Sequence, residues 1–328
     1  MARMFVSEIQ PNQEVSGTFV LAEKQLKTAR NNMPFLTLKL VDRTGAITGR
    51  VWDRAVDISN SLVTGGPVCL RGRCETYREE MQLQVQEISS VAVSDVDPRD
   101  FLPVCPIASE TLIEEFKKIV LGIGNGPLCQ LLTHIFRDRE IWDRFKLAPA
   151  AKSMHHAYLG GLLEHTVAVA KLATSIAERY PDLDRDILVT GAVLHDIGKI
   201  YEFDYSLCID YSDSGRLIGH TVMGMQLLEE KIRTLQDVSI EEEGIILKHM
   251  ILSHHGTAEF GAVKLPMTRE ALVLHMADDM DAKINCLTRI MGEGEDAWTP
   301  YQKLFDRYFF RGFPASKDVC TAPTEDFE

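Results

Sequence analysis

The sequence predicts a multidomain α+β protein in which a small N-terminal β-barrel is followed by an all-α helical bundle. Two patterns carry this prediction. Short runs of alternating apolar and polar residues recur up to about residue 95, and helical spacing of apolar residues begins at Ser109 and continues. The length of 328 residues also favours two domains, since single cores rarely grow past about 250–300 residues.

Residues 1–95 predict five short strands with one helical piece between the third and the fourth. In the second strand the leucines at 36, 38 and 40 alternate with Phe35, Thr37 and Lys39, so the leucines should face a core. The expected strands are Val15–Ala22, Phe35–Val41, Ile47–Trp52, Val68–Thr76 and Met81–Val91, and the expected helix is Ala55–Leu62. This order matches the OB-fold, a small five-stranded barrel.

The run from Phe35 to Trp52 also resembles the OB modules of the anticodon-binding type. OB-folds hold single-stranded nucleic acid on strands two and three, by stacking bases on aromatic rings and tracking phosphates with basic groups. The nucleic-acid-binding residues expected on this face are Phe35, Lys39, Arg50 and Trp52. The alternative is that Phe35 and Trp52 complete the barrel core or an interdomain contact.

The formal charge of −13 is unevenly distributed along the chain. Residues 1–95 hold 11 basic and 11 acidic side chains, whereas the remainder holds 24 basic against 37 acidic. An acidic chain should not bind nucleic acid tightly through bulk electrostatics, because phosphate contacts need Lys and Arg. This pattern fits a neutral N-terminal module that holds a polyanion by local contacts. The acidic remainder would then be a domain that binds cations. The alternative is that the acidity only keeps the protein soluble.

We expect a cytoplasmic protein with reduced thiols. No run of 18 apolar residues predicts a transmembrane helix, and the N-terminal stretch MARMFVSEIQ does not have the pattern of a secretory signal. The seven cysteines are scattered and form no CxxC motif; they stand at positions 69, 74, 105, 129, 208, 286 and 320. Such spacing predicts neither a disulfide framework nor a zinc knuckle.

The segment 94–106, SDVDPRDFLPVCP, predicts a linker because it is rich in proline and aspartate. A helix should then begin near Ser109, with an apolar face formed by Leu112, Phe116, Ile119 and Val120. From Trp298 the chain is aromatic, and we expect this part to pack on a partner or on the other domain. The last residues, TAPTEDFE, should form a frayed tail.

Nine of the ten histidines follow residue 150, and several fall on predicted helices. In the helix expected at 162–180, His165 shares the apolar stripe of Val169, Leu172 and Ile176 and should point inward. In the helix expected at 185–197, His195 also points inward, and Gly198 is the expected C-cap.

Two further helices should carry polar side chains to the same interior. Ser239 and Glu242 predict a capping box for a helix that reaches His254, and Gly256 ends that helix. Thr268 predicts the N-cap of a helix that carries Asp278. Four helices would then each bring a nitrogen or carboxylate ligand to an inner face, which is how helix bundles build metal sites.

Imidazole and carboxylate donors without thiolates favour Mn²⁺, Fe²⁺, Co²⁺ or Mg²⁺ over a structural zinc. One carboxylate beside a histidine can bridge two ions, and such a pair activates water for attack on phosphorus. A single inward histidine is more often a core residue, so the ordered set carries the argument. The set is His165, then His195-Asp196-Ile197-Gly198-Lys199, Gly219-His220-Thr221, His254-His255 and Ala277-Asp278-Asp279-Met280-Asp281-Ala282.

This ordered set resembles the HD-domain superfamily of metal-dependent phosphohydrolases, over about residues 150–290. The resemblance implies two divalent ions, of which Mn²⁺ is the preferred candidate and Co²⁺, Fe²⁺ and Mg²⁺ are alternatives. The first ion would be held by His165, His195, Asp196 and Asp278. The second would be held by Asp196, His220, His254 and His255. Asp279 and Asp281 are alternatives to Asp278, and His249 and His275 fit no ligand position.

A narrower resemblance lies in the stretches 149–156 (PAAKSMHH) and 160–166 (GGLLEHT). Together with an N-terminal OB-fold, they are similar to the YhaM-type 3′→5′ exoribonucleases over nearly the whole chain. The family implies a 3′→5′ exonuclease that releases nucleoside monophosphates from single-stranded RNA, with single-stranded DNA as a further candidate. It also implies that His156 and Lys152 face the scissile phosphate or the 3′-terminal nucleotide. Without the family, His155 and His156 would be a solvated loop pair.

The predicted catalytic residues are Asp196, Lys199 and His156. Lys199 either contacts a substrate phosphate or neutralises a helix C-terminus. Two alternative functions remain: a phosphodiesterase or nucleotidase acting on small nucleotides, and a non-catalytic single-strand-binding protein. The chain lacks a GYP tripeptide, which argues against a cyclic-dinucleotide phosphodiesterase of this superfamily. The sequence also leaves room for a homo-oligomer. The expected domain bounds are 1–95 for the OB-fold, 96–150 for the linker and helical segment, 151–290 for the HD domain and 291–328 for the aromatic C-terminal segment and tail.

Overall fold

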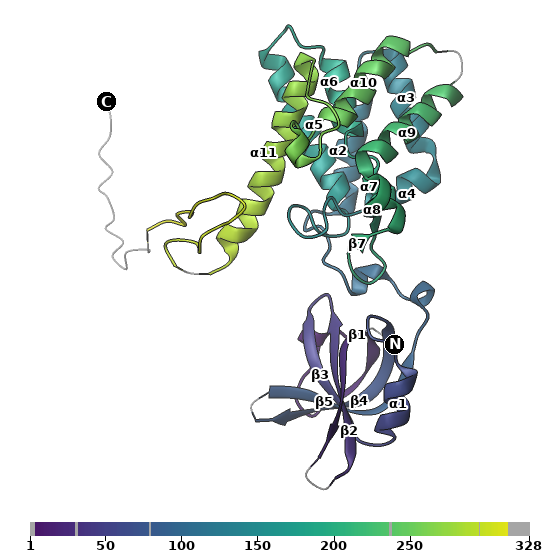
Figure 1. Ribbon diagram of the computed structural model, residues 1–328, viewed down its shortest axis with the longest axis vertical. Helices are drawn as coiled ribbons and strands as arrows, with labels where there is room; N and C mark the ends of the chain where they lie inside the picture. Colours follow the sequence, from purple (N-terminus) through teal and green to yellow (C-terminus); the bar gives the residue numbers. More distant parts are fainter. Residues whose placement is uncertain (1–3, 30–31, 79, 236–237, 295, 314–328) are drawn as a thin grey trace, which may run out of the picture.

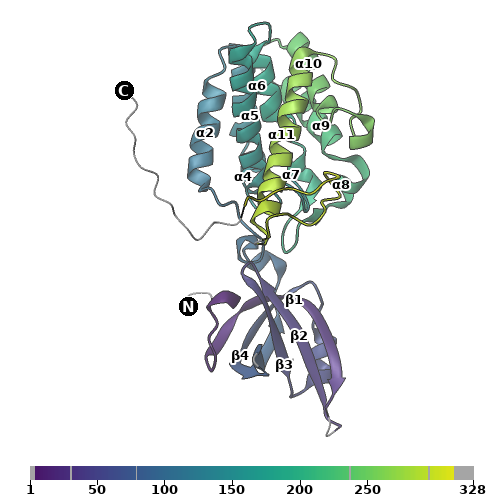
Figure 2. The same ribbon diagram turned by 90° about the vertical axis from the view of Figure 1, so that its left-hand side faces the viewer.

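The computed structural model describes residues 4–29, 32–78, 80–235, 238–294 and 296–313. A β-barrel built by the N-terminal part of the chain lies at one end of an elongated molecule, and a bundle of helices lies at the other (Figures 1 and 2). The predicted multidomain α+β class is therefore confirmed. The tail 321–328 lies outside the described residues.

The five strands close into a barrel in the order β1-β2-β3-β5-β4, with β3 and β5 parallel. This order, with a helix between β3 and β4, is the OB-fold topology expected from the sequence. The elements are β1 (Glu14–Thr28), β2 (Pro34–Asp42), β3 (Gly45–Val51), α1 (Ala55–Ser61), β4 (Pro67–Tyr77) and β5 (Glu80–Ser90). The leucines at 36, 38 and 40 are buried in the barrel core, as their alternation predicts.

Strand β1 runs six residues beyond the expected end at Ala22. A register shift between Leu21 and Glu23 lets the strand bend, and the chain then continues to pair with β2 as far as Thr28. The second half of β1 is mostly exposed, so its polar sequence gave no alternation from which to predict a strand. Trp52, expected at the end of the third strand, lies one residue beyond β3.

The connection from the barrel contains two short 3₁₀ turns, η2 (Val93–Asp95) and η3 (Pro98–Asp100); a further turn, η1 (Val6–Glu8), precedes the barrel. Helix α2 (Ser109–Leu121) then begins where the sequence predicted and buries Leu112, Phe116 and Val120. The remaining helices are α3 (Gly126–Arg137), α4 (Arg139–Leu147), α5 (Gly161–Arg179), α6 (Arg185–Leu194), α7 (Lys199–Glu202), α8 (Asp213–Ile218), α9 (His220–Thr234), α10 (Glu241–Ser253) and α11 (Arg269–Gly292). Two short strands, β6 (Phe203–Asp204) and β7 (Asp210–Tyr211), form a hairpin, and η4 (Ala258–Phe260) follows α10.

Helix α5 is the central helix of the bundle, in contact with α2, α4, α6 and α11. Its buried residues are mainly small and β-branched, for example Val169, Ala170 and Ala173, so neighbouring helices approach closely. Figure 2 shows α5, α6 and α11 side by side. None of the helices within the described ranges combines the length and apolarity that crossing a membrane requires.

Two expected helix caps are wrong. Helix α6 ends at Leu194, and Gly198 has φ −65° and precedes α7 as its N-cap, so it is not a left-handed C-cap. The capping box of Ser239 and Glu242 does not form, because α10 begins one residue later than expected with Ile240 at its N-cap. The cap at Thr268 is confirmed: its hydroxyl accepts a hydrogen bond from the amide of Ala271.

The aromatic segment after α11 folds back on the end of that helix. The guanidinium group of Arg311 donates to the carbonyls of Ile290 and Met291, which lie in the last turn of α11. Trp298 pairs with Phe310. The segment thus satisfies carbonyls at the end of a helix, which have no partner within it, and many of its rings remain exposed.

Candidate metal centre

The predicted ligands meet in the interior of the bundle although they come from five different helices or helix ends. His165 lies in the first turns of α5, and His195 and Asp196 follow the last residue of α6. His220 is the first residue of α9. His254 and His255 follow α10, and Asp278 lies in the middle of α11.

A first group of donor atoms is formed by His165, His195 and Asp278. The Nε2 atoms of the two histidines are 3.2 Å apart, and Nε2 of His165 is 3.1 Å from Oδ1 of Asp278. Both imidazole rings are fully buried. Asp279 points away from this group, because its exposed carboxylate pairs with Lys283. The geometry therefore favours Asp278 over Asp279.

A second group is formed by His220, His254 and His255. The Nε2 atoms of His220 and His255 are 3.0 Å apart. Within this group, buried His254 also adjoins the first group, since its ring centroid is 5.1 Å from that of His195 and 5.6 Å from that of His220.

Asp196 lies between the two groups with one oxygen toward each. Its Oδ2 atom is 3.5 Å from Nε2 of His165 and 3.3 Å from Nε2 of His195. Its Oδ1 atom is 3.4 Å from Nε2 of His220 and 3.5 Å from Nε2 of His254. A carboxylate in this position can hold two cations at once.

The outer ring nitrogens of four of these histidines are engaged by acceptors. Nδ1 of His195 and of His254 lies 2.8 and 2.7 Å from the carbonyls of Ala192 and Ile251. Nδ1 of His165 and of His220 faces a carboxylate, at 2.7 and 2.9 Å. Since an N–H must occupy each of these Nδ1 positions, the Nε2 atoms are the nitrogens that face into the cluster and could bind a metal ion.

This arrangement fits divalent cations. Lone pairs of neighbouring Nε2 atoms about 3 Å apart repel one another unless a positive charge lies between them. In addition, Oδ1 of Asp196 and Nε2 of His254 are buried without a hydrogen-bond partner, which is costly unless another ligand satisfies them. The donor set contains only imidazole and carboxylate groups, which suits Mn²⁺, Fe²⁺ or Co²⁺.

Lys199 is buried beside this cluster, and its Nζ atom is 2.6 Å from Oδ2 of Asp196. Burial alone would lower the pKa of Lys199, but the charge of Asp196 outweighs it and raises the pKa. Lys199 is therefore an ammonium that stabilises the central carboxylate. Burial and the charge of Lys199 also lower the pKa of nearby His155 to about 3, so His155 is neutral.

His156 does not have the open position that the family resemblance implied. Its side chain is only 4% exposed, and both ring nitrogens are engaged. Nε2 lies 3.0 Å from Asp281, and Nδ1 lies 3.0 Å from Glu164. Both ring nitrogens thus face carboxylates of the protein itself, and the catalytic contact implied by the family stays a prediction.

Sequence reasoning missed several residues that support the ligands. Glu202 accepts hydrogen bonds from both Nδ1 and the backbone amide of His220. His275, which fits no ligand position, has Nδ1 2.8 Å from the carbonyl of His254 and thus braces the turn after α10. His249 is on the outside and accepts a hydrogen bond from the amide of Met267. Nothing in the helical periodicity marks Glu202, because α7 has only four residues.

The outer face of the barrel carries the residues predicted to bind nucleic acid. The rings of Phe35 and Trp52 are stacked, with centroids 4.8 Å apart and an interplanar angle of 24°. Trp52 is 43% exposed, and neither ring is part of the barrel core. The guanidinium of Arg50 lies between the rings of Phe35 and Tyr77, at 5.8 and 5.3 Å from their centroids.

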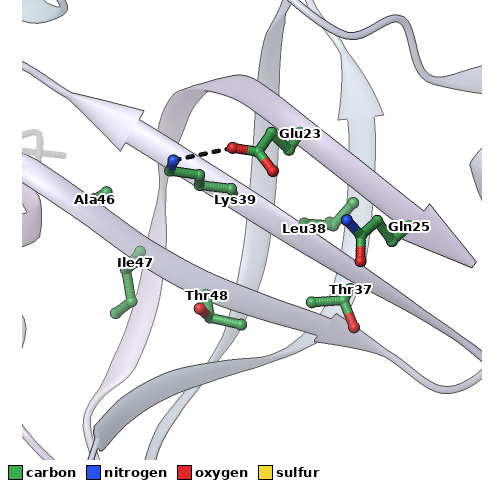
Figure 3. A pocket seen from close by; sticks show the side chains of 8 residues that line it. All are labelled: Glu23, Gln25, Thr37, Leu38, Lys39, Ala46, Ile47 and Thr48. Atoms are coloured by element: carbon green, nitrogen blue, oxygen red, sulfur yellow. Dashed lines mark hydrogen bonds and ion pairs between the residues drawn. The ribbon is translucent and has the colours of Figure 1, made fainter. Parts of the chain in front are cut away.

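A pocket lies on the outer face of β2, where Thr37 and Lys39 alternate with the buried leucines as Phe35 does (Figure 3). Its polar lining includes Thr37 and Thr48, and Lys39 crosses it to pair with Glu23 at 2.9 Å. Lys152, the remaining predicted contact, is far along the chain in the loop before His155. Its exposed ammonium pairs with Asp210 at 2.8 Å.

Comparison with known proteins agrees with this architecture. Residues 162–283 match the family model described as HD domain. The 3′-5′ exoribonuclease YhaM of Halalkalibacterium halodurans is 33% identical over 86% of this chain and 87% of its own length. The 3′-5′ exoribonuclease YhaM of Listeria monocytogenes serotype 4b is 34% identical over 85% of this chain and 88% of its own length.

Among solved structures, the second OB-fold domain of replication protein A from Methanococcus maripaludis matches 27% of this chain and 95% of its own, with 19% identity and a TM-score of 0.24. The identity and coverage of the two exoribonucleases are much greater and extend over both parts of the molecule. The chain belongs to the YhaM family of 3′-5′ exoribonucleases.

Proposed function

We propose that this protein is a metal-dependent 3′→5′ exonuclease that releases nucleoside monophosphates from single-stranded RNA, and that single-stranded DNA is a second substrate. The observation that carries the proposal is the buried cluster in which Asp196 lies between two groups of histidines. Membership of the YhaM family supplies the polarity and the class of substrate.

Two divalent ions would share the cluster, with Mn²⁺ as the preferred native metal. The first would be held by His165, His195, Asp196 and Asp278, and the second by Asp196, His220, His254 and His255. When bound, such a pair supplies an activated water and stabilises the negative charge that develops on the phosphate. Lys199 and Glu202 hold Asp196 and His220 in place from outside the cluster.

The barrel would hold the strand whose 3′ end enters the helical part. Phe35 and Trp52 already form a stack to which a base can be added, and such stacking tolerates any base. Lys39 and Arg50 lie on the same face and would contact phosphates. Lys152 would contact phosphates nearer the metal cluster, since it lies three residues before His155.

Cleavage of RNA labelled at either end, with a panel of metals, tests this proposal. A 5′-labelled single strand should give a ladder of shortening products, whereas a 3′-labelled strand should give labelled mononucleotide from the first turnover. Mn²⁺ should support the fastest reaction, followed by Co²⁺, Fe²⁺ or Mg²⁺. An intact oligonucleotide with every metal, or a labelled mononucleotide from the 5′ end, would contradict the proposal.

Removal of the aromatic stack should weaken binding without altering the chemical step. We expect Trp52→Ala or Phe35→Ala to weaken the affinity for a single-stranded oligonucleotide by about 5- to 150-fold, because stacking on an aromatic ring contributes about 1–3 kcal/mol per base. Fluorescence anisotropy without added metal measures this loss. Tyr180→Ala removes an exposed ring at the end of α5 and should leave affinity unchanged. Equal affinities of all three variants and the wild type would contradict the role of the stack.

Chelation of the metal should lower thermal stability as well as activity. The clustered Nε2 atoms repel one another without a cation, and an ion present at about 100 times its Kd adds about 2.7 kcal/mol. For a domain of this size we expect the Tm to fall by about 5–10 °C in EDTA. Differential scanning fluorimetry with and without Mn²⁺ measures the shift. His195→Ala should reduce the shift, and a wild-type Tm unaffected by EDTA would contradict the metal site.

The proposal includes a cytoplasmic location and self-association. All six cysteines within the described residues are free, as expected of a protein kept in a reducing compartment. Helix α11 exposes apolar side chains every fourth residue, at Leu272, Met276, Met280 and Ile284. Such a stripe on a solvent-facing helix supports a homo-oligomer, because monomers rarely expose contiguous apolar surface.

A further inference from the structure

A second set of polar groups, one buried and two partly buried, lies behind His165, on the side of its ring that faces away from the metal cluster. It consists of Asp281 on α11, His156 in the loop before α5, and Glu164 at the start of α5. We propose that Asp281 and His156 are positioning residues, which fix His165 in the tautomer and orientation that direct its Nε2 atom at the metal. This inference rests on the proposed metal centre.

Helix α11 engages both nitrogens of His165 from one face. Oδ1 of Asp278 lies 3.1 Å from Nε2, whereas Oδ2 of Asp281 lies 2.7 Å from Nδ1. The two aspartates are three residues apart, so they project from the same side of the helix. Because Asp281 is an acceptor, Nδ1 of His165 carries a proton, and Nε2 is the nitrogen that would bind a metal ion. A carboxylate behind a ligating histidine fixes ring orientation and raises the basicity of the ligand.

Asp281 is itself held by His156. The same Oδ2 atom lies 3.0 Å from Nε2 of His156, and that ring is bound on its other side by Glu164 and by the hydroxyl of Tyr158, each 3.0 Å from Nδ1. The Tyr158 hydroxyl also donates to Glu164 at 2.5 Å. Glu164 precedes His165 in sequence, so the chain of contacts starts and ends on α5.

The backbone around His156 is fixed in an unusual conformation. His156 has φ +46°, which is rare for a residue other than glycine, and its amide donates to Oδ1 of Asn285 on α11 at 2.9 Å. Gly161 packs on the loop so closely that a Cβ there would lie 2.0 Å from the carbonyl oxygen of His156. Strained conformations persist where the surroundings over-determine them, and they gather at functional sites. A ring held this firmly is suited to orienting another group rather than to moving with a substrate.

The same atoms offer a second interpretation, which is a third metal site. One ligand atom each of His156, His165 and Asp281 lies within 4.8 Å of the others. The hydrogen bonds argue against an ion there, because both ring nitrogens of His156 and the outer nitrogen of His165 already have close acceptors. An ion would have to displace all of these contacts. The number of ions bound therefore separates the two interpretations.

Calorimetric titration of metal-free protein with Mn²⁺ tests the inference directly. Asp281→Asn keeps the shape of the side chain but removes its charge. We expect it to lower the affinity for one of the two Mn²⁺ ions by about 10- to 100-fold, the range measured for partners of ligating histidines. His156→Ala should do the same. His156→Gln should lose less Mn²⁺ affinity than His156→Ala, because the side-chain amide of glutamine retains an N–H that reaches Asp281. The affinity of the other ion should remain that of the wild type.

Asp279→Asn is the matched control. Asp279 is on the same helix, two residues before Asp281, but it is exposed and pairs with Lys283. Its replacement should leave both Mn²⁺ affinities unchanged. In oligonucleotide cleavage, Asp281→Asn should leave KM unchanged and lower kcat at limiting Mn²⁺, and the loss should be recovered at saturating Mn²⁺. A purely structural role would not give recovery by metal alone.

Four results would overturn the inference. Wild-type Mn²⁺ affinities in both Asp281→Asn and His156→Ala would show that neither residue orients His165. Three ions in the wild type and two in Asp281→Asn would instead establish a third metal site. A raised KM with unchanged Mn²⁺ affinity would assign His156 to the substrate. A wild type that binds no Mn²⁺ would contradict the proposed function itself, and the inference with it. If His156→Ala does not fold by circular dichroism, the nearly isosteric Asp281→Asn decides.

Discussion

Replacement of Asp196 by asparagine is expected to abolish cleavage while the oligonucleotide remains bound. Each carboxylate oxygen of Asp196 lies within 3.5 Å of two histidine Nε2 atoms. Asparagine offers one acceptor oxygen and no charge, so it cannot serve both ions. Loss of a residue that hydrogen-bonds a metal ligand lowers metal affinity or activity by about 10- to 100-fold. Asp196 is itself the expected bridging ligand, so we expect its loss to lower kcat by more than about 100-fold. Single-turnover cleavage at saturating enzyme measures this loss apart from binding.

The same substitution should also lower stability, for a separate reason. Asp196→Asn leaves the ammonium of Lys199 buried without its charged partner, and breaking a buried ion pair costs about 3–5 kcal/mol. Adding Lys199→Met should therefore restore part of the stability measured by urea unfolding, but none of the activity. Cleavage by Asp196→Asn above about one-tenth of the wild-type rate would exclude a bridging role.

The fold was predictable because its determinants are local in the sequence. Alternating leucines in β2 specify a strand with one buried face, and the turn residues between β2 and β3 bring the strands into register. The extension of β1 was not predictable, since it depends on a bulge and on pairing with β2 alone. The order of strands in the barrel follows from the number and spacing of strands, with the helix after the third.

The candidate ligands were predictable for a different reason. His165 and His195 lie at positions of a helix that are otherwise apolar. A polar side chain buried there costs free energy unless it has a hydrogen-bond partner or binds a metal ion. The supporting residues could not be found in this way. Asp281 was considered only as an alternative to Asp278, because the sequence does not show which side of His165 each carboxylate approaches. His156 has a role that depends on a left-handed loop, which no pattern indicates.

Gly198 is the clearest case of a residue whose role the sequence did not show. Its replacement by alanine is expected to lower both stability and metal binding, and its effect is the largest we expect after that of Asp196→Asn. The sequence suggested a C-cap glycine, but the φ angle of Gly198 is −65°, which any residue can adopt. Glycine is required there because another part of the backbone lies too close for a side chain. A Cβ on Gly198 would lie 2.0 Å from the carbonyl oxygen of His220 and 2.6 Å from the amide nitrogen of Gly224. Both atoms are backbone atoms of α9, so no side chain can move aside. Gly198→Ala must displace the first turn of α9, and with it a candidate ligand.

We expect Gly198→Ala to lower the free energy of unfolding by at least about 1–3 kcal/mol, as overpacking does in close-packed interiors, and to weaken the second ion. Urea unfolding and Mn²⁺ titration measure the two effects. Gly126→Ala is the matched control: Gly126 is the first residue of α3, and a Cβ added there would have no neighbour within 4 Å. That change should alter stability by no more than about 1 kcal/mol.

If Gly198→Ala acts by displacing His220, then adding it to His220→Ala should cost little further activity, since the two changes remove the same ligand. Additive losses in the double variant would show that Gly198 acts elsewhere, and a Gly198→Ala protein with normal stability and two bound ions would contradict the close approach of α7 and α9.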